Sequence, residues 1–150
     1  MNELKEQLHD LCTHYINKNI DDIEAAIADR RIAIAAETKS SMGDKYETTR
    51  EMLQQEINMN LRRLGEAQAG LAVLNAIDPG MSTDVVTAGS LVVTVTGGYY
   101  ISVSAGSHVI DGKKYYAVSA SSPVGKLLLG KKKGDAITLN NNRITIISVQ

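Results

Sequence analysis

The spacing of apolar residues changes character at Asp78-Pro79-Gly80. Before this point, apolar residues recur at steps of three and four, which is the period of an amphipathic helix. The first such run is Ile16, Ile20, Ile23, Ile27 and Ile34, with Arg30 at one polar seam position. The second run is Leu53, Ile57, Leu61, Leu64, Leu71 and Leu74. Residues 1–78 are therefore predicted to form two long helices.

A short segment rich in turn residues, Lys39–Asp44, separates the two runs. Two amphipathic helices joined by a short turn form an antiparallel hairpin, here a coiled coil. With the turn near residue 43, the numbers of facing positions add to roughly 86. Arg30 is then expected beside Glu56, and Arg62 beside Glu24, as ordinary surface ion pairs.

Two asparagines interrupt the first helical run. Asn17 and Asn19 are poor helix formers, so a break or kink is expected near them. Asn19 could cap a new helix that starts at Ile20.

After Gly80 the apolar period becomes two, which is typical of strands. Leu91 to Val103 alternates around Gly97-Gly98, which predicts a hairpin with the two glycines in the turn. Further strands are expected at Lys113–Ala120, Ala136–Leu139 and Arg143–Val149, with residues 140–142 as the turn between the last two. The fold class is therefore α+β: a helical hairpin at 1–78 and a small antiparallel sheet with one short helix at 79–150.

That short helix lies in the string SPVGKLLLGKKKGD, from Ser122 to Asp135. Ser122 can cap the start, and Pro123 suits the first helical position because it needs no N–H there. Gly130 can adopt the left-handed conformation that ends a helix. The leucines at 127–129 are expected to supply its buried face.

Charge differs between the two halves. Residues 1–78 have nine Lys or Arg and fourteen Asp or Glu, and residues 79–150 have seven and three. Neither half is basic enough to predict binding to free DNA. The chain begins without an apolar signal core and has no run of roughly 20 apolar residues, so a cytoplasmic location is expected. His9 and Cys12, three residues apart, lack the further ligands that a zinc site needs.

An acidic pair lies at the predicted turn, in Gly43-Asp44-Lys45-Tyr46-Glu47. Carboxylates three residues apart lie on one face of a helix, so Asp44 and Glu47 could bind a hard divalent cation. The same spacing is close to a capping box, with Asp44 as the cap. The residues alone favour the cap, and both interpretations remain open.

Two motifs, in this order, resemble the GreA/GreB family of transcript cleavage factors: Gly43–Glu47 and the string from Ser122 to Asp135. The resemblance implies an FKBP-like domain at 79–150 and RNA polymerase as the partner. It implies that the coiled coil enters the secondary channel, where Asp44 and Glu47 share a Mg²⁺ with the polymerase at the 3′ end of a backtracked nascent RNA. It also implies docking through Ser122, Pro123, Gly125, Lys126 and Lys131, with no cofactor of the chain's own.

The chain departs from the family after Glu47, where the family reads Asn-Ala-Glu-Tyr and this chain reads Thr48-Thr49-Arg50-Glu51. A regulator or inhibitor that occupies the same channel without stimulating cleavage is one alternative, and a coiled-coil adaptor is another. Prolyl isomerase activity would need an aromatic pocket. The domain offers only the tyrosine pairs 99–100 and 115–116, and adjacent strand residues point to opposite faces, so at most two rings share a surface.

Overall fold

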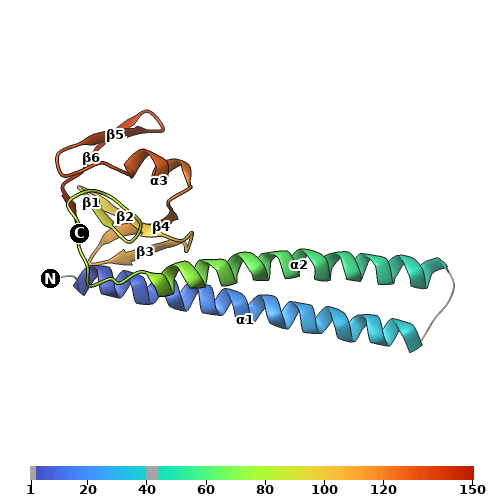
Figure 1. Cartoon of the computed structure of the whole chain (residues 1–150). Coiled ribbons are helices and arrows are strands. Elements are labelled where there is room, and N and C mark those ends of the chain that lie inside the picture. Colours follow the sequence, from blue (N-terminus) through green and yellow to red (C-terminus); the bar gives the residue numbers. More distant parts are fainter. Residues whose placement is uncertain (1–2, 40–43) are drawn as a thin grey trace. The chain divides into compact units, whose positions relative to one another are not determined.

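The computed structural model describes residues 3–39 and 44–150, and the predicted turn therefore lies mostly outside the described residues. Two long helices come first, α1 (Glu3–Lys39) and α2 (Asp44–Ala76) (Figure 1). The remaining elements are β1 (Leu91–Thr94), β2 (Gly97–Ser102), β3 (Ser107–Ile110), β4 (Lys113–Ser119), α3 (Pro123–Leu128), β5 (Ala136–Leu139), β6 (Asn142–Thr145) and β7 (Ser148–Val149). The α+β class, with a helical hairpin followed by a sheet and one short helix, is confirmed.

Helix α1 is continuous, so the predicted break near Asn17 and Asn19 is wrong. Both asparagines are exposed, while Ile16 and Ile23 on either side of them are buried. An exposed Asn lowers helix stability by only about 0.7 kcal/mol relative to Ala. Burial of an Ile side chain contributes about 1.5–3 kcal/mol, so packing outweighs the local preference.

The two helices pack through a seam with the four-and-three spacing of a coiled coil. On α2 the seam residues are Leu53, Ile57, Asn60, Leu64 and Ala67, all buried or half-buried. Leu61 also belongs to the predicted apolar run of this helix, but it lies beside the seam and is 43% exposed. The heptad spacing continues from Ile57 to Asn60, whereas the apolar pattern along the chain points to the neighbouring Leu61.

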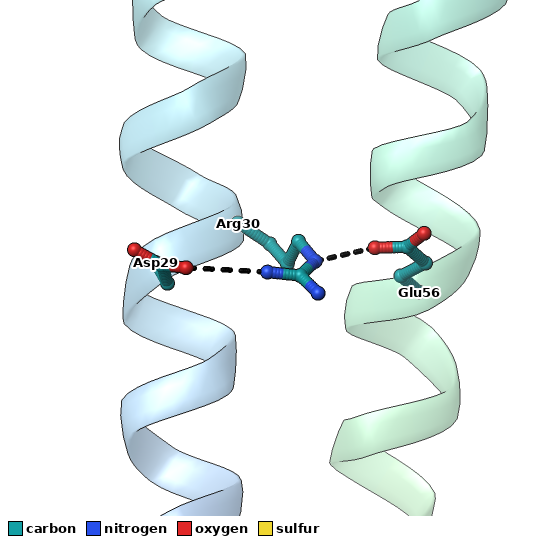
Figure 2. A network of polar contacts seen from close by, with 3 residues as sticks. All are labelled: Asp29, Arg30 and Glu56. Atoms are coloured by element: carbon teal, nitrogen blue, oxygen red, sulfur yellow. Dashed lines mark hydrogen bonds and ion pairs between the residues drawn. The ribbon is translucent and has the colours of Figure 1, made fainter.

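Facing positions follow the predicted register. Arg30 Nε donates to a Glu56 carboxylate oxygen on α2, and the two residue numbers add to 86 (Figure 2). The companion pair of Arg62 and Glu24 forms no ion pair within the described part of the chain.

The main sheet has five strands in the order β3-β4-β2-β1-β7, and β5 pairs with β6 in a separate ladder. All pairs are antiparallel except β2 with β4, which is parallel. The expected strand at 143–149 is divided into β6 and β7, because β6 pairs with β5 whereas β7 joins β1. Strand β3 was not predicted from the sequence.

Gly97 and Gly98 begin β2 and do not form the turn, because Thr94 pairs with Gly97 and the turn is Val95-Thr96. Glycine is needed at these two positions for a reason other than a turn. A Cβ on Gly97 would lie 1.8 Å from the Lys114 carbonyl oxygen, and one on Gly98 would lie 2.2 Å from the Val92 carbonyl oxygen. The glycines therefore allow neighbouring backbones to approach closely.

Contacts divide the chain into two compact units: Met1–Tyr15 together with Gly70–Gln150, and Ile16–Ala69. One core of the first unit joins the sheet to α3, β5 and β6 through Val86, Val92, Ile101, Leu128, Ile137 and Ile146. The first residues of α1 also belong to this unit, where Leu8 and Cys12 are fully buried. The second unit has a separate core around Ile23, Ile27, Ile57 and Ala67.

Candidate functional site

The acidic pair lies at the start of α2. Asp44 is the first residue of the helix, and Glu47 lies in its first turn with an exposed side chain. A helix N-terminus has a partial positive charge, which stabilises carboxylates there. The Asp44 side chain lies outside what the structure describes, so the choice between cap and metal ligand stays a prediction.

Carboxylate oxygens suit Mg²⁺, which prefers hard oxygen ligands in a six-coordinate shell. Asp44 and Glu47 can supply only part of such a shell. Within residues 3–39 and 44–150, no group of three His, Cys, Asp or Glu could hold a metal ion. The pair therefore fits a metal ion only where another molecule completes the coordination.

The departure from the family motif places a cation close to the pair. Arg50 lies one helical turn after Glu47, and its Nη1 donates weakly to the Tyr46 hydroxyl at 3.5 Å. A guanidinium three residues from a carboxylate lies on the same helix face. Glu51, four residues after Glu47, lies on the same face with an exposed carboxylate that balances the charge of Arg50.

The capped helix forms as predicted. Ser122 Oγ accepts a hydrogen bond from the Gly125 N–H at 3.0 Å, and its hydroxyl donates to the Ser119 carbonyl at 2.7 Å. Pro123 starts the helix, and Gly130 has φ of +82°, which is left-handed. Gly125 is buried, and a Cβ there would lie 2.2 Å from the Ser119 carbonyl oxygen, so this glycine lets α3 approach the end of β4.

Of the three leucines expected to supply the buried face of α3, Leu128 alone does so. Leu128 is fully buried, but Leu127 and Leu129 are 41% and 38% exposed. A helix of six residues presents only one face to the core, so consecutive leucines cannot all reach it. These two leucines, exposed Lys126 and half-buried Lys131 all lie in α3 or directly after it, and they are hereafter called the α3 surface. The partner role predicted for Ser122, Pro123, Gly125, Lys126 and Lys131 stays a prediction.

His9 and Cys12 take part in packing between α1 and β2. The His9 Nδ1 and the Tyr100 hydroxyl are 2.7 Å apart, and burial lowers the pKa of His9. Burial also raises the pKa of the Cys12 thiol to about 11, although the nearby Ser102 hydroxyl opposes this shift. The buried Ser102 Oγ nevertheless has no hydrogen-bond partner among the described residues. A thiol with such a high pKa is a poor metal ligand at neutral pH.

Lys5 has a structural role that the sequence pattern did not indicate. It is only 2% exposed, and its ammonium donates to the carbonyl oxygens of Met81 at 2.5 Å and Gln150 at 3.2 Å. Burial lowers the pKa of Lys5, and the Asp78 carboxylate partly offsets this. Lys5 also lines a cleft of about 430 Å³ beside Ile77 and Met81. The spacing of apolar residues could not indicate this role, because the partners of Lys5 are backbone carbonyls far away in the sequence.

The tyrosines are arranged as the strand alternation predicts. Tyr100 and Tyr115 are buried, whereas Tyr99 and Tyr116 stack on each other with ring centroids 5.6 Å apart. The Lys114 ammonium lies 5.4 Å from the Tyr116 ring centroid. Two rings therefore share each surface, and the outer pair is stacked together rather than arranged around a pocket.

No family model matches the chain, and no curated protein matches it. A similar solved structure is described as "Structure of the transcription factor Gfh1". The similarity covers 91% of this chain and 92% of that chain, with 19% sequence identity and a TM-score of 0.37. A similarity this low supports no conclusion by itself. Across residues 3–39 and 44–150, none of the helices combines the length and apolarity needed to cross a bilayer.

Proposed function

We propose that this chain is an accessory factor of RNA polymerase that stimulates cleavage of backtracked transcripts. In this function the hairpin enters the secondary channel, and Asp44 and Glu47 act at the polymerase catalytic centre. The chain itself is not expected to turn over substrate. The main support is the combination of an antiparallel hairpin, an acidic pair at the start of α2, and a separate β domain with the Ser122-capped helix.

The exposure of Glu47 supports a role outside the hairpin. Its carboxylate is in the first helical turn, away from the buried core around Ile27 and Ile57. A carboxylate at this position is available to a partner, while the helix dipole favours its charged form.

The α3 surface supports docking on a protein partner. It offers two exposed leucines and the cations of Lys126 and Lys131 close together along the chain, a combination that suits an acidic partner with apolar side chains. The Ser122 cap and the packing of Gly125 hold α3 in place, so these two residues would act by positioning the surface.

The proposed chemistry is hydrolysis of the RNA backbone with two metal ions. The polymerase would supply most ligands, and Asp44 and Glu47 would complete the shell of the second Mg²⁺. In two-metal catalysis, one ion activates the water and the other stabilises the leaving oxygen. The contribution of this chain is to place two carboxylate oxygens near the RNA 3′ end. A capping role for Asp44 would be compatible with this, since a cap needs only one carboxylate oxygen.

A cleavage assay on a stalled, backtracked elongation complex tests the proposal. The chain should release a 3′ RNA fragment faster than polymerase alone, and Asp44→Asn or Glu47→Gln should return the rate to that of polymerase alone. Glu51→Gln, which removes another exposed carboxylate one turn later, is the matched control and should keep the stimulation. Circular dichroism must show unchanged helix content for each variant.

The departure at residues 48–51 favours a second candidate, a regulator that occupies the channel without promoting cleavage. Arg50, three residues after Glu47, places a guanidinium that would compete with a metal ion for the Glu47 carboxylate. In the same assay such a factor would slow intrinsic cleavage. If the chain neither binds polymerase nor changes cleavage, both proposals are wrong and the adaptor alternative remains.

A further inference from the structure

The seam of the hairpin contains a charged residue. Arg30 continues the four-and-three spacing of Ile23 and Ile27, and its side chain is only 37% exposed. Its Nε donates to Glu56 on the opposite helix, and its Nη1 donates to Asp29 Oδ2 at 3.2 Å (Figure 2). The guanidinium therefore lies between a carboxylate of its own helix and one of the facing helix.

The apolar seam residues do not define the register by themselves. Ile and Leu side chains fit equivalent holes after a shift of one heptad, so an aliphatic seam is nearly degenerate. A polar residue at a single seam position removes this degeneracy, because only one register satisfies it. Within the described residues, Arg30 with Glu56 is the ion pair that joins the two helices; the others lie within α1.

The sequence around this pair penalises both neighbouring registers. If α2 shifts by one heptad in one direction, Arg30 faces Arg63 and Glu56 faces Glu37, so two like-charge pairs form. In the other direction, Arg30 faces Thr49 and Glu56 faces Ile23, so both charges lose their partner. The observed register alone matches opposite charges at these positions.

A shift of register would also change the start of α2. Moving the helices by one heptad moves the midpoint of the turn by roughly three to four residues. In one direction the midpoint falls near residue 47, which would take Glu47 out of the first turn of α2. The register therefore determines where the acidic pair stands on the helix.

We propose that Arg30 and Glu56 lock the register of the hairpin and so position Asp44 and Glu47. They are positioning residues and make no contact with the reacting RNA. The consequence for cleavage rests on the proposed function, but the register lock itself does not.

Spin-label distances measure the register directly. Asp21 and Gly65 are exposed, face each other in the observed register, and a side chain at Gly65 meets no atom within 4 Å. Each is replaced by Cys for nitroxide labelling in a Cys12→Ala background. A shift of one heptad displaces one helix by about 10 Å along its axis, which pulsed electron resonance resolves.

The parent should give a single distance. Arg30→Leu removes the charged residue from the seam and leaves Asn60 of α2 as its polar residue, so the helices should remain folded but show a second distance population. Glu56→Arg should do the same, and the exchanged pair Arg30→Glu with Glu56→Arg should restore the single distance. Lys18→Leu removes an ion pair that lies within α1, and this control should leave the parent distance unchanged.

A single parent-like distance in both Arg30→Leu and Glu56→Arg would overturn the lock, as would failure of the exchanged pair to restore it. If one single variant loses helix content, the distances in the other single variant and in the exchanged pair decide whether the lock exists. In the cleavage assay, the fraction of stimulation lost should match the fraction of shifted register. The distance measurement contains no polymerase, so absence of stimulation by the parent would refute the proposed function and leave the register result standing.

Discussion

At the scale of single residues, the glycines separate into positions that need a bare backbone and positions that do not. Gly125 is buried against the Ser119 carbonyl oxygen, whereas a Cβ added at Gly65 in α2 would meet no atom within 4 Å. Both are helical, so helix propensity alone would treat them alike. Because their surroundings differ, replacement by alanine is expected to lower the free energy of unfolding at one position and to raise it at the other.

Gly125→Ala should destabilise the protein, because its Cβ would force α3 away from the end of β4. Overpacking of this kind costs about 1–3 kcal/mol. Gly65→Ala should instead stabilise α2 by up to about 1 kcal/mol, since Ala has the higher helix propensity. Denaturant unfolding of both variants measures the difference, and equal effects would show that the close approach at Gly125 is unimportant.

At the scale of elements, the sequence pattern predicts where helices occur better than which residues face each other. Both Ile57 and Leu61 fit the helical period, but Ile57 is 3% exposed and Leu61 is 43% exposed. The ambiguity arises because steps of three and four are equally compatible with a helix, and only the packing of α1 against α2 selects Asn60 for the seam.

Ile57→Ala should therefore destabilise the hairpin by about 2–5 kcal/mol through loss of burial and the cavity left behind. Leu61→Ala should change the free energy of unfolding by less than about 0.5 kcal/mol, as for other surface substitutions. The two variants remove apolar side chains of the same size one turn apart. Similar losses in thermal melts would contradict the assigned seam.

At the scale of the whole molecule, the start of α1 belongs with the β domain, although Lys5 and its partner Met81 are 76 residues apart along the chain. Lys5 bonds to the carbonyls of Met81 and Gln150, and His9 bonds to Tyr100. Tyr15 adds an edge contact with His108, with ring centroids 6.5 Å apart. A fragment that begins at residue 79 would lack these contacts.

This arrangement predicts a pH dependence. Burial lowers the pKa of His9 in the folded state, and Lys5 adds to this while Asp10 opposes it. The unfolded chain therefore binds the proton first, and stability falls as the pH drops below about 6.5 until the folded-state pKa is passed. His9→Gln should reduce this loss, measured by urea unfolding between pH 7.5 and 5.5. His14→Gln removes an exposed histidine on the same helix and should behave like the parent; an unchanged slope in His9→Gln would contradict the assignment.

The sequence by itself determined the elements whose cause is local. Apolar period defined the two helices and most strands, and the cap at Ser122 and the left-handed Gly130 marked α3. The facing of Arg30 and Glu56 also followed, because a predicted turn near residue 43 pairs positions whose numbers add to roughly 86.

Only the tertiary structure decided what depends on neighbours distant in sequence. The continuity of α1 past its asparagines, the parallel pairing of β2 with β4, the exposure of Leu127 and Leu129, and the burial of Lys5 all depend on such neighbours. Local preferences are worth tenths of a kcal/mol per residue, whereas burial of one large side chain is worth about 1.5–3 kcal/mol. Where the two disagree, packing prevails, and no pattern along the chain reveals which surface will be covered.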